Sequence, residues 1–62
     1  MVQDSDISVR GIPTQHEDLM VFQFVHRPTG LSIERVVSRH AYRYGIENLY
    51  VQLVELVDKG NT

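Results

Sequence analysis

The sequence contains no cysteine, which excludes disulfide bridges and thiolate zinc sites. It also lacks an apolar run long enough to cross a bilayer and a basic start followed by an apolar stretch, so we expect a cytoplasmic protein. A chain of 62 residues can form only one small domain, and domains of this size bury about 60% of their unfolded surface. We therefore expect one domain over residues 1–62, with a flexible tail at 1–5, a frayed end at 60–62, and a core completed by a partner or a second copy.

The charges are few but unevenly distributed. The net charge of −2 argues against wholesale attraction to nucleic acid or to an anionic membrane. Residues 1–25 carry a net charge of −3 and residues 45–62 a net charge of −2, whereas residues 26–44 carry four arginines against one glutamate, a net charge of +3. An anionic ligand is therefore expected at this middle block, where two histidines add charge below neutral pH.

The sequence 27-RPTG-30 predicts the loop of a β-hairpin. Proline pre-sets the second loop position and Gly30 allows a positive φ, which places His26 opposite Leu31. This register gives one mostly apolar face, with the cross-strand pairs Phe24 with Ile33, Phe22 with Arg35, and Met20 with Val37. The second strand is expected to end near Val37.

Residues 31–37 also fit an alternative, a helix that begins at Ser32 and ends at Gly45, because apolar side chains recur there at helical spacing. We favour the strand, since both arms of the hairpin are rich in β-branched and aromatic residues. A short edge strand at Ile7 and Val9 is predicted before the hairpin, because glycine and proline at 11 and 13 interrupt it. Residues 14–18 are polar and predict an exposed loop.

An amphipathic helix is predicted before Gly60, with a break at Gly45 that separates it from a short turn at 38–44. Its apolar arc holds Ile46, Leu49, Tyr50, Leu53, Val54, Leu56 and Val57. The predicted fold class is thus α+β: an antiparallel hairpin or three-stranded meander packed on a C-terminal helix, in the order βββα. Because this arc is wider than a thin hairpin needs, we expect a protein-binding or regulatory module whose interface, with a partner or in a homodimer, is Leu49, Tyr50, Leu53 and Leu56.

No cofactor, metal or catalytic site is predicted, and we expect no enzyme. His16, His26 and His40 do not have the spacing of metal ligands. Ser38 and His40 lack the strand-turn motif and the orienting partner that nucleophilic catalysis needs. Residues 37–54 follow the spacing of a helix-turn-helix, but the positions that would face DNA offer no donors to bases or phosphates, so DNA is not an expected partner.

RNA or ribosome binding is the alternative function. Arg39, Tyr42, Arg43 and Tyr44 combine cations and rings that can clamp phosphates and stack bases, although the same residues also fit a solvated turn with guanidinium groups over tyrosine rings. Arg35 lies on the apolar face and reaches either the rim of the sheet or an anion. The candidate RNA contacts are Arg27, Arg35, Arg39, His40 and Arg43.

Four segments resemble the catalytic domain of class I peptide chain release factors. Residues 6-DISVRG-11 are similar to the strand that leads into its GGQ loop, Gln15-His16 to the end of that loop, 26-HRPTGLSIE-34 to its His-x-Pro-Thr-Gly hairpin, and Ser38 with His40 to the start of its basic helix. The resemblance implies contact with ribosomal RNA. It does not imply peptidyl-tRNA hydrolysis, because proline and threonine at 13 and 14 replace the two glycines and the last helix is acidic where the family's is lysine-rich.

Overall fold

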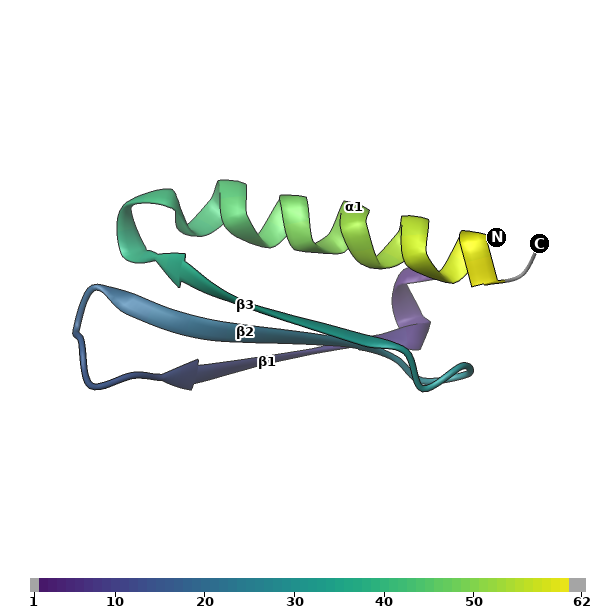
Figure 1. The fold of residues 1–62 in the computed structure, drawn as a ribbon, viewed down its shortest axis with the longest axis horizontal. Helices are drawn as coiled ribbons and strands as arrows, with labels where there is room; N and C mark the ends of the chain where they lie inside the picture. The colour runs from purple at the N-terminus through teal and green to yellow at the C-terminus, as the bar shows by residue number, and fades with distance from the viewer. Residues whose placement is uncertain (1, 61–62) are drawn as a thin grey trace.

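The computed structural model describes residues 2–60, which form three strands followed by one long helix (Figure 1). The elements are the 3-10 turn η1 (Asp4–Asp6), strands β1 (Ile7–Pro13), β2 (Leu19–His26) and β3 (Ser32–Ser38), the 3-10 turn η2 (Arg39–Ala41) and helix α1 (Tyr42–Gly60). The strands form one antiparallel sheet in the order β1-β2-β3, and α1 covers one of its faces. The predicted α+β fold with the order βββα is confirmed.

The hairpin of β2 and β3 has the predicted register. Phe24 pairs with Ile33, Phe22 with Arg35, and Met20 with Val37. Its four-residue loop is closed by two backbone hydrogen bonds of 2.8 Å, from the His26 N–H to the Leu31 carbonyl and from the Gly30 N–H to the His26 carbonyl. Gly30 has a φ of 76°, as the loop requires. Residues 32–38 are therefore a strand, and the alternative of a helix that begins at Ser32 is wrong.

The first strand is longer than predicted, because it continues through Gly11 to Pro13. Gly11 does not interrupt the strand but makes room for β2, since a Cβ at this position would lie 3.1 Å from the Phe22 ring. Pro13 is tolerated because it is the last residue of an edge strand, where its missing N–H costs no ladder hydrogen bond. Residues 14–18 form the exposed loop that the sequence predicts.

The sequence predicts a flexible tail at 1–5 and a frayed end at 60–62. Within residues 1–5, Asp4 begins the turn η1 and Val2 packs against the core. At the other end, Gly60 is the last residue of α1, and residues 61 and 62 lie outside the described part of the chain. Among residues 2–60, no helix combines the length and the apolar character that crossing a bilayer requires.

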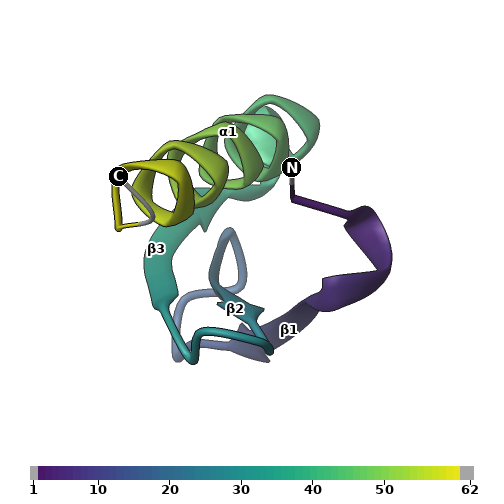
Figure 2. The same ribbon diagram turned by 90° about the vertical axis from the view of Figure 1, so that its right-hand side faces the viewer.

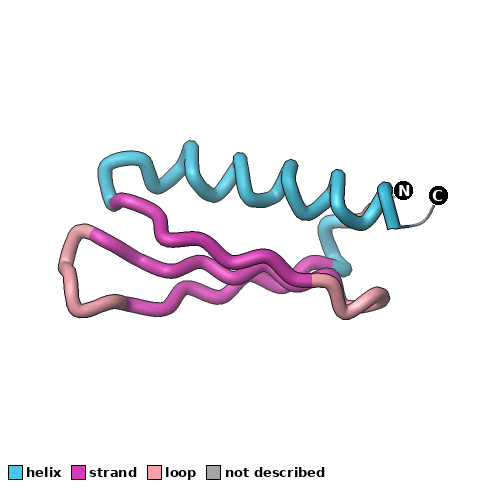
Figure 3. Tube along the Cα trace, in the orientation of Figure 1, coloured by secondary structure: helices cyan, strands magenta, loops and turns pink. Residues whose placement is uncertain are grey.

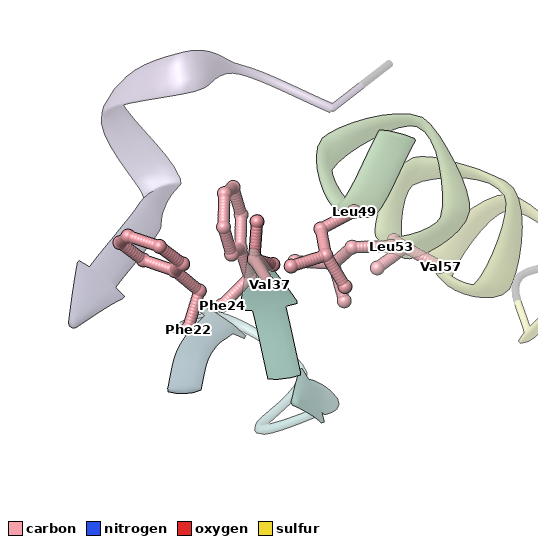
Figure 4. Packing of buried hydrophobic residues seen from close by; sticks show 6 residues of the cluster. All are labelled: Phe22, Phe24, Val37, Leu49, Leu53 and Val57. Carbon is pink, nitrogen blue, oxygen red and sulfur yellow. The ribbon is translucent and has the colours of Figure 1, made fainter. Parts of the chain in front are cut away.

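The core lies between α1 and the inner face of β2 and β3 (Figure 4). The helix contributes Leu49, Leu53 and Val57, which follow one another at a spacing of four residues and so form one stripe. The sheet contributes the buried side chains of Phe22, Phe24 and Val37. The amphipathic pattern of the helix is thus explained by packing within one chain.

The helix begins three residues before the predicted break at Gly45, so that break is wrong. Gly45 lies inside the first turn of α1, where a Cβ would come within 2.5 Å of Cγ1 of Val37. The glycine therefore permits a close crossing of helix and sheet. The break lies instead at η2, where Ser38 Oγ accepts a hydrogen bond from the His40 N–H, and the Tyr42 ring meets the Phe22 ring edge-to-face at 4.9 Å.

Candidate protein-binding surface

The helix covers only part of the inner face of the sheet. Viewed end-on, α1 lies on the β3 side and the turn η1 lies on the β1 side (Figure 2). Val9 of β1 points to the same face as Phe24, its cross-strand partner. Phe24 is 1% exposed, whereas Val9 is 54% exposed. At Val9, the inner face of β1 therefore stays open to solvent beside the helix, whereas Ile7 at the start of the strand packs against the core.

A groove of about 580 Å³ lies between β1 and the near flank of α1. We call it the α1–β1 groove. Five apolar or aromatic residues and two carboxylates line it: Val9, Phe24, Ile46, Tyr50 and Val51, with Asp4 and Glu47. Ile46 and Tyr50 stand one turn apart on the flank of α1 that faces β1. Val51, which is 51% exposed, forms the outer rim.

One hydrogen bond ties the N-terminal turn to the helix at this groove. The Tyr50 hydroxyl donates to Asp4 Oδ1. This hydrogen bond, with a smaller contribution from desolvation and from the negative charge of Asp4, raises the pKa of Tyr50 above its ordinary value. Tyr50 is therefore protonated at neutral pH and holds Asp4 at the edge of the groove.

The opposite flank of α1 has a different character. A groove of about 630 Å³ lies there between α1 and β3, and four of its six lining residues are polar or charged: Gln52, Glu55, Asp58 and Lys59, beside Ile33 and Leu56. Further along this flank, Arg35 Nη2 donates a hydrogen bond of 3.0 Å to Gln52 Oε1 and so bridges β3 and α1. This larger groove is thus bridged near one end and holds more polar and charged side chains than the α1–β1 groove, which makes it the poorer candidate for an apolar partner.

The structure corrects the predicted interface. Leu49 and Leu53 are 2% and 0% exposed, so neither is available to a partner. The prediction assumed a thin hairpin, but the three-stranded sheet presents an inner face wide enough to bury both leucines. Leu56 remains 41% exposed on the β3 flank, and Tyr50 lies on the β1 flank.

The sequence reasoning missed Val9 and Val51, which shape the α1–β1 groove. Val51 falls on the polar side of the predicted helix, where an aliphatic residue is unusual, and this was the one available signal. Val9 was assigned to a short edge strand. Its exposure depends on how far α1 extends across the sheet, which only the tertiary structure defines.

The five candidate RNA contacts are all exposed, but the fold separates them: Arg27, Arg35, Arg39, His40 and Arg43. Arg27 lies in the hairpin loop at one end of β3, and Arg39 lies at the other end. Since β3 has seven residues and a strand rises about 3.3 Å per residue, about 20 Å separate these two positions. Only Arg39, His40 and Arg43 form a compact group, at the start of α1.

The histidines do not converge on one site. His16 is exposed in the loop before β2, whereas His26 is only 6% exposed and its Nδ1 lies 2.8 Å from Thr29 Oγ1. His26 therefore has a structural role under the hairpin loop and is not a surface group for an anion. In the described part of the chain, no three His, Asp or Glu side chains gather as metal ligands do.

No protein-family model, curated protein or solved structure matches this chain. The resemblance to release factors thus stays a prediction from four short segments. The surface itself is the basis for a functional proposal.

Proposed function

We propose that this chain is a small non-enzymatic module that binds another protein through the α1–β1 groove. The observation that carries the proposal is that Val9 and Val51, 54% and 51% exposed, lie on two different elements and line the same groove. Burial of apolar surface contributes about 25 cal/mol per Å². A partner that buries both valines is stabilised by this term, and the α1–β1 groove that it fills is already formed in the free chain.

The occupant we propose is an extended segment of another protein, which adds a strand to β1. As an edge strand, β1 has one row of backbone N–H and C=O groups that β2 does not engage. Pro13 has no N–H, so the added strand would pair along residues 7–12. Because side chains alternate along a strand, every second side chain of this segment would lie beside Val9 and over the groove.

The charges of the groove specify the partner further. Its two charged residues, Asp4 and Glu47, are both carboxylates, and Asp6 stands at the entrance to β1. Lysine or arginine at one of the positions of the segment that face the groove would therefore be attracted. A second copy of this chain would bring carboxylates against carboxylates, which favours a different protein as the occupant of this groove.

Selection of random peptides displayed on phage tests this proposal. The immobilised protein is expected to enrich peptides that carry both apolar residues and lysine or arginine at alternate positions, which are the positions that face the groove. Val51→Lys places a positive charge in the groove, where it disrupts the apolar contact and repels the basic residues of the peptides, and should weaken these peptides at least about tenfold. Amide hydrogen exchange of β1 should slow when the peptide is bound, because its free edge becomes hydrogen-bonded.

Leu56→Lys is the matched control. It introduces the same charge on the opposite flank of the same helix, at a residue with similar exposure, and should leave peptide affinity within about twofold. Equal losses in the two variants, or selected peptides without basic residues, would contradict binding in the α1–β1 groove.

RNA binding is a second candidate, favoured by one observation. Tyr44 is 72% exposed beside Arg43 at the start of α1, where its ring is free to stack on a base. Affinity for a single-stranded RNA should then fall steeply as salt increases, because each phosphate contact releases counterions. It should also fall in Tyr44→Ala. Binding that is insensitive to salt, or no binding, would remove this candidate.

A further inference from the structure

The outer face of the sheet is a second open surface, distinct from the α1–β1 groove. Helix α1 lies on the opposite side of the sheet along its whole length (Figure 3). Within residues 2–60, no helix or strand covers the outer face. This face nevertheless presents aliphatic side chains, of which Val36 is 61% exposed. Residues 2–60 thus leave one complete face of their sheet without a cover.

The strand register arranges the outer face in rows across the sheet. One row is Arg10 of β1, Gln23 of β2 and Glu34 of β3, since Arg10 pairs with Gln23 and Gln23 pairs with Glu34. A positive charge therefore stands at one edge of the sheet and a negative charge at the other. The polar amide of Gln23 lies between them.

The neighbouring row is entirely aliphatic. It consists of Ile12, Val21 and Val36, which are paired in the same way across the three strands. On the other side of Gln23, the third row is Ser8, Val25 and Ser32, in which Val25 is the one aliphatic side chain. The outer face thus combines one aliphatic row, one charged row and one mostly polar row.

We infer that a second copy of this chain covers the outer face, with the two sheets packed face to face around a two-fold axis parallel to β2. This rotation lays β1 of each copy over β3 of the other and keeps the rows in step. Arg10 then faces Glu34 of the second copy, and Glu34 faces Arg10 of the second copy. In the next row, Ile12 meets Val36 of the second copy.

The order of charges selects this arrangement over the other in-plane axis. A two-fold axis perpendicular to the strands, through the same row, would lay β1 over β1. Arg10 would then face Arg10 and Glu34 would face Glu34, which like-charge repulsion disfavours. With the axis parallel to β2, the central residues meet their own copies: Val21 and Val25 make apolar contacts, and the two Gln23 amides can donate to and accept from each other.

The size of the face indicates a weak dimer. Three strands about 4.8 Å apart and seven residues of about 3.3 Å each give an outer face of roughly 14 Å by 23 Å. Each face then covers roughly 320 Å², so two faces packed on each other bury roughly 640 Å², which is the size of a weak, transient contact rather than of a stable interface. We therefore expect dissociation at high micromolar concentrations.

Charge exchange tests this dimer by sedimentation equilibrium of the full chain at several concentrations. Arg10→Glu and Glu34→Arg should each raise Kd at least about tenfold, because like charges then face each other at both symmetry-related positions. The double variant with both exchanges should return Kd to within about threefold of the wild-type value. Val36→Asp should leave only monomer, and its circular dichroism spectrum should be unchanged because Val36 lies on the surface.

Val51→Asp serves as the control. Val51 lies on α1, on the other side of the sheet from the outer face, so this substitution should leave the Kd of the dimer unchanged. A wild-type chain that is monomeric at millimolar concentration would overturn the proposal. So would single exchanges without effect, or a double exchange that fails to restore the dimer. Loss of the dimer in Val51→Asp, with retention in Val36→Asp, would place self-association on the α1 side of the sheet and contradict the outer-face dimer.

Discussion

Gly45 of α1 lies directly against Val37 of β3, so close that a Cβ on the glycine would be 2.5 Å from Val37 Cγ1. Val37 is buried and β-branched, so its χ1 cannot rotate freely to make room. This contact sets how closely the first turn of α1 approaches the sheet. It also aligns the stripe that begins at Leu49 with the phenylalanines of β2.

Gly45→Ala should therefore destabilise the protein although alanine favours helices. The intrinsic gain is about 1 kcal/mol, and overpacking a buried contact costs about 1–3 kcal/mol. We expect a net loss of about 1 kcal/mol in the free energy of unfolding measured with urea. In a Val37→Ala background, the same change should become neutral or stabilising.

Gly60→Ala is the matched control for this prediction. A Cβ at Gly60 would make an ordinary contact, 3.9 Å from Leu31 Cδ1, so the free energy of unfolding should not fall. If Gly45→Ala stabilised the wild-type chain, helix propensity would outweigh the contact with Val37.

The hairpin was predictable because its information is local. Pro28 and Gly30 specify the loop, and the loop then determines the register for each pair along β2 and β3. The break at Gly45 was predicted wrongly because this position needs a glycine for its close contact with Val37, a residue on another element, and not to end the helix. Sequence spacing records where a helix can end but not which side chain must be absent for two elements to cross.

The proposed binding surface was less predictable than the fold. Leu49 and Leu53 were assigned to an interface because the width of the sheet was underestimated, and β1 proved long enough to complete it. The α1–β1 groove exists because α1 crosses β2 and β3 and leaves β1 open. This lateral placement depends on packing among Phe22, Phe24 and the helix, which no periodicity in a single segment describes.

Truncation of a buried leucine and of an exposed leucine of α1 should have different effects on the free energy of unfolding. Leu53→Ala removes a side chain that is 0% exposed and should lower the free energy of unfolding by about 2–5 kcal/mol. Leu56→Ala, at 41% exposure, should lower it by less than about 1 kcal/mol. Urea denaturation of both variants checks this, and similar losses would contradict the orientation of α1.

Gly30 offers a test of backbone strain without side-chain crowding. Its φ is +76°, and no atom lies within 4 Å of a Cβ built there. Gly30→Ala should thus destabilise the protein by about 1 kcal/mol through the left-handed backbone alone. Gly30→Asn should cost less, since asparagine tolerates this region better. Thermal unfolding followed by circular dichroism gives the order, and an asparagine variant less stable than the alanine variant would contradict it.

The hydrogen bond from Tyr50 to Asp4 should make stability depend on pH in the alkaline range. The pKa of Tyr50 is raised in the folded chain, so its contribution to stability is complete below the unfolded value of about 10 and is lost as pH rises through the folded value. In Asp4→Ala, the main cause of the raised pKa is absent, and the decline of stability above pH of about 10 should be shallower. The tyrosinate absorbance of Asp4→Ala, after subtraction of the titration of Tyr50→Phe, should show a lower pKa for Tyr50 than in the wild type. An unchanged Tyr50 pKa in Asp4→Ala would mean that η1 does not dock on α1 in solution, and the α1–β1 groove would then lack its acidic edge.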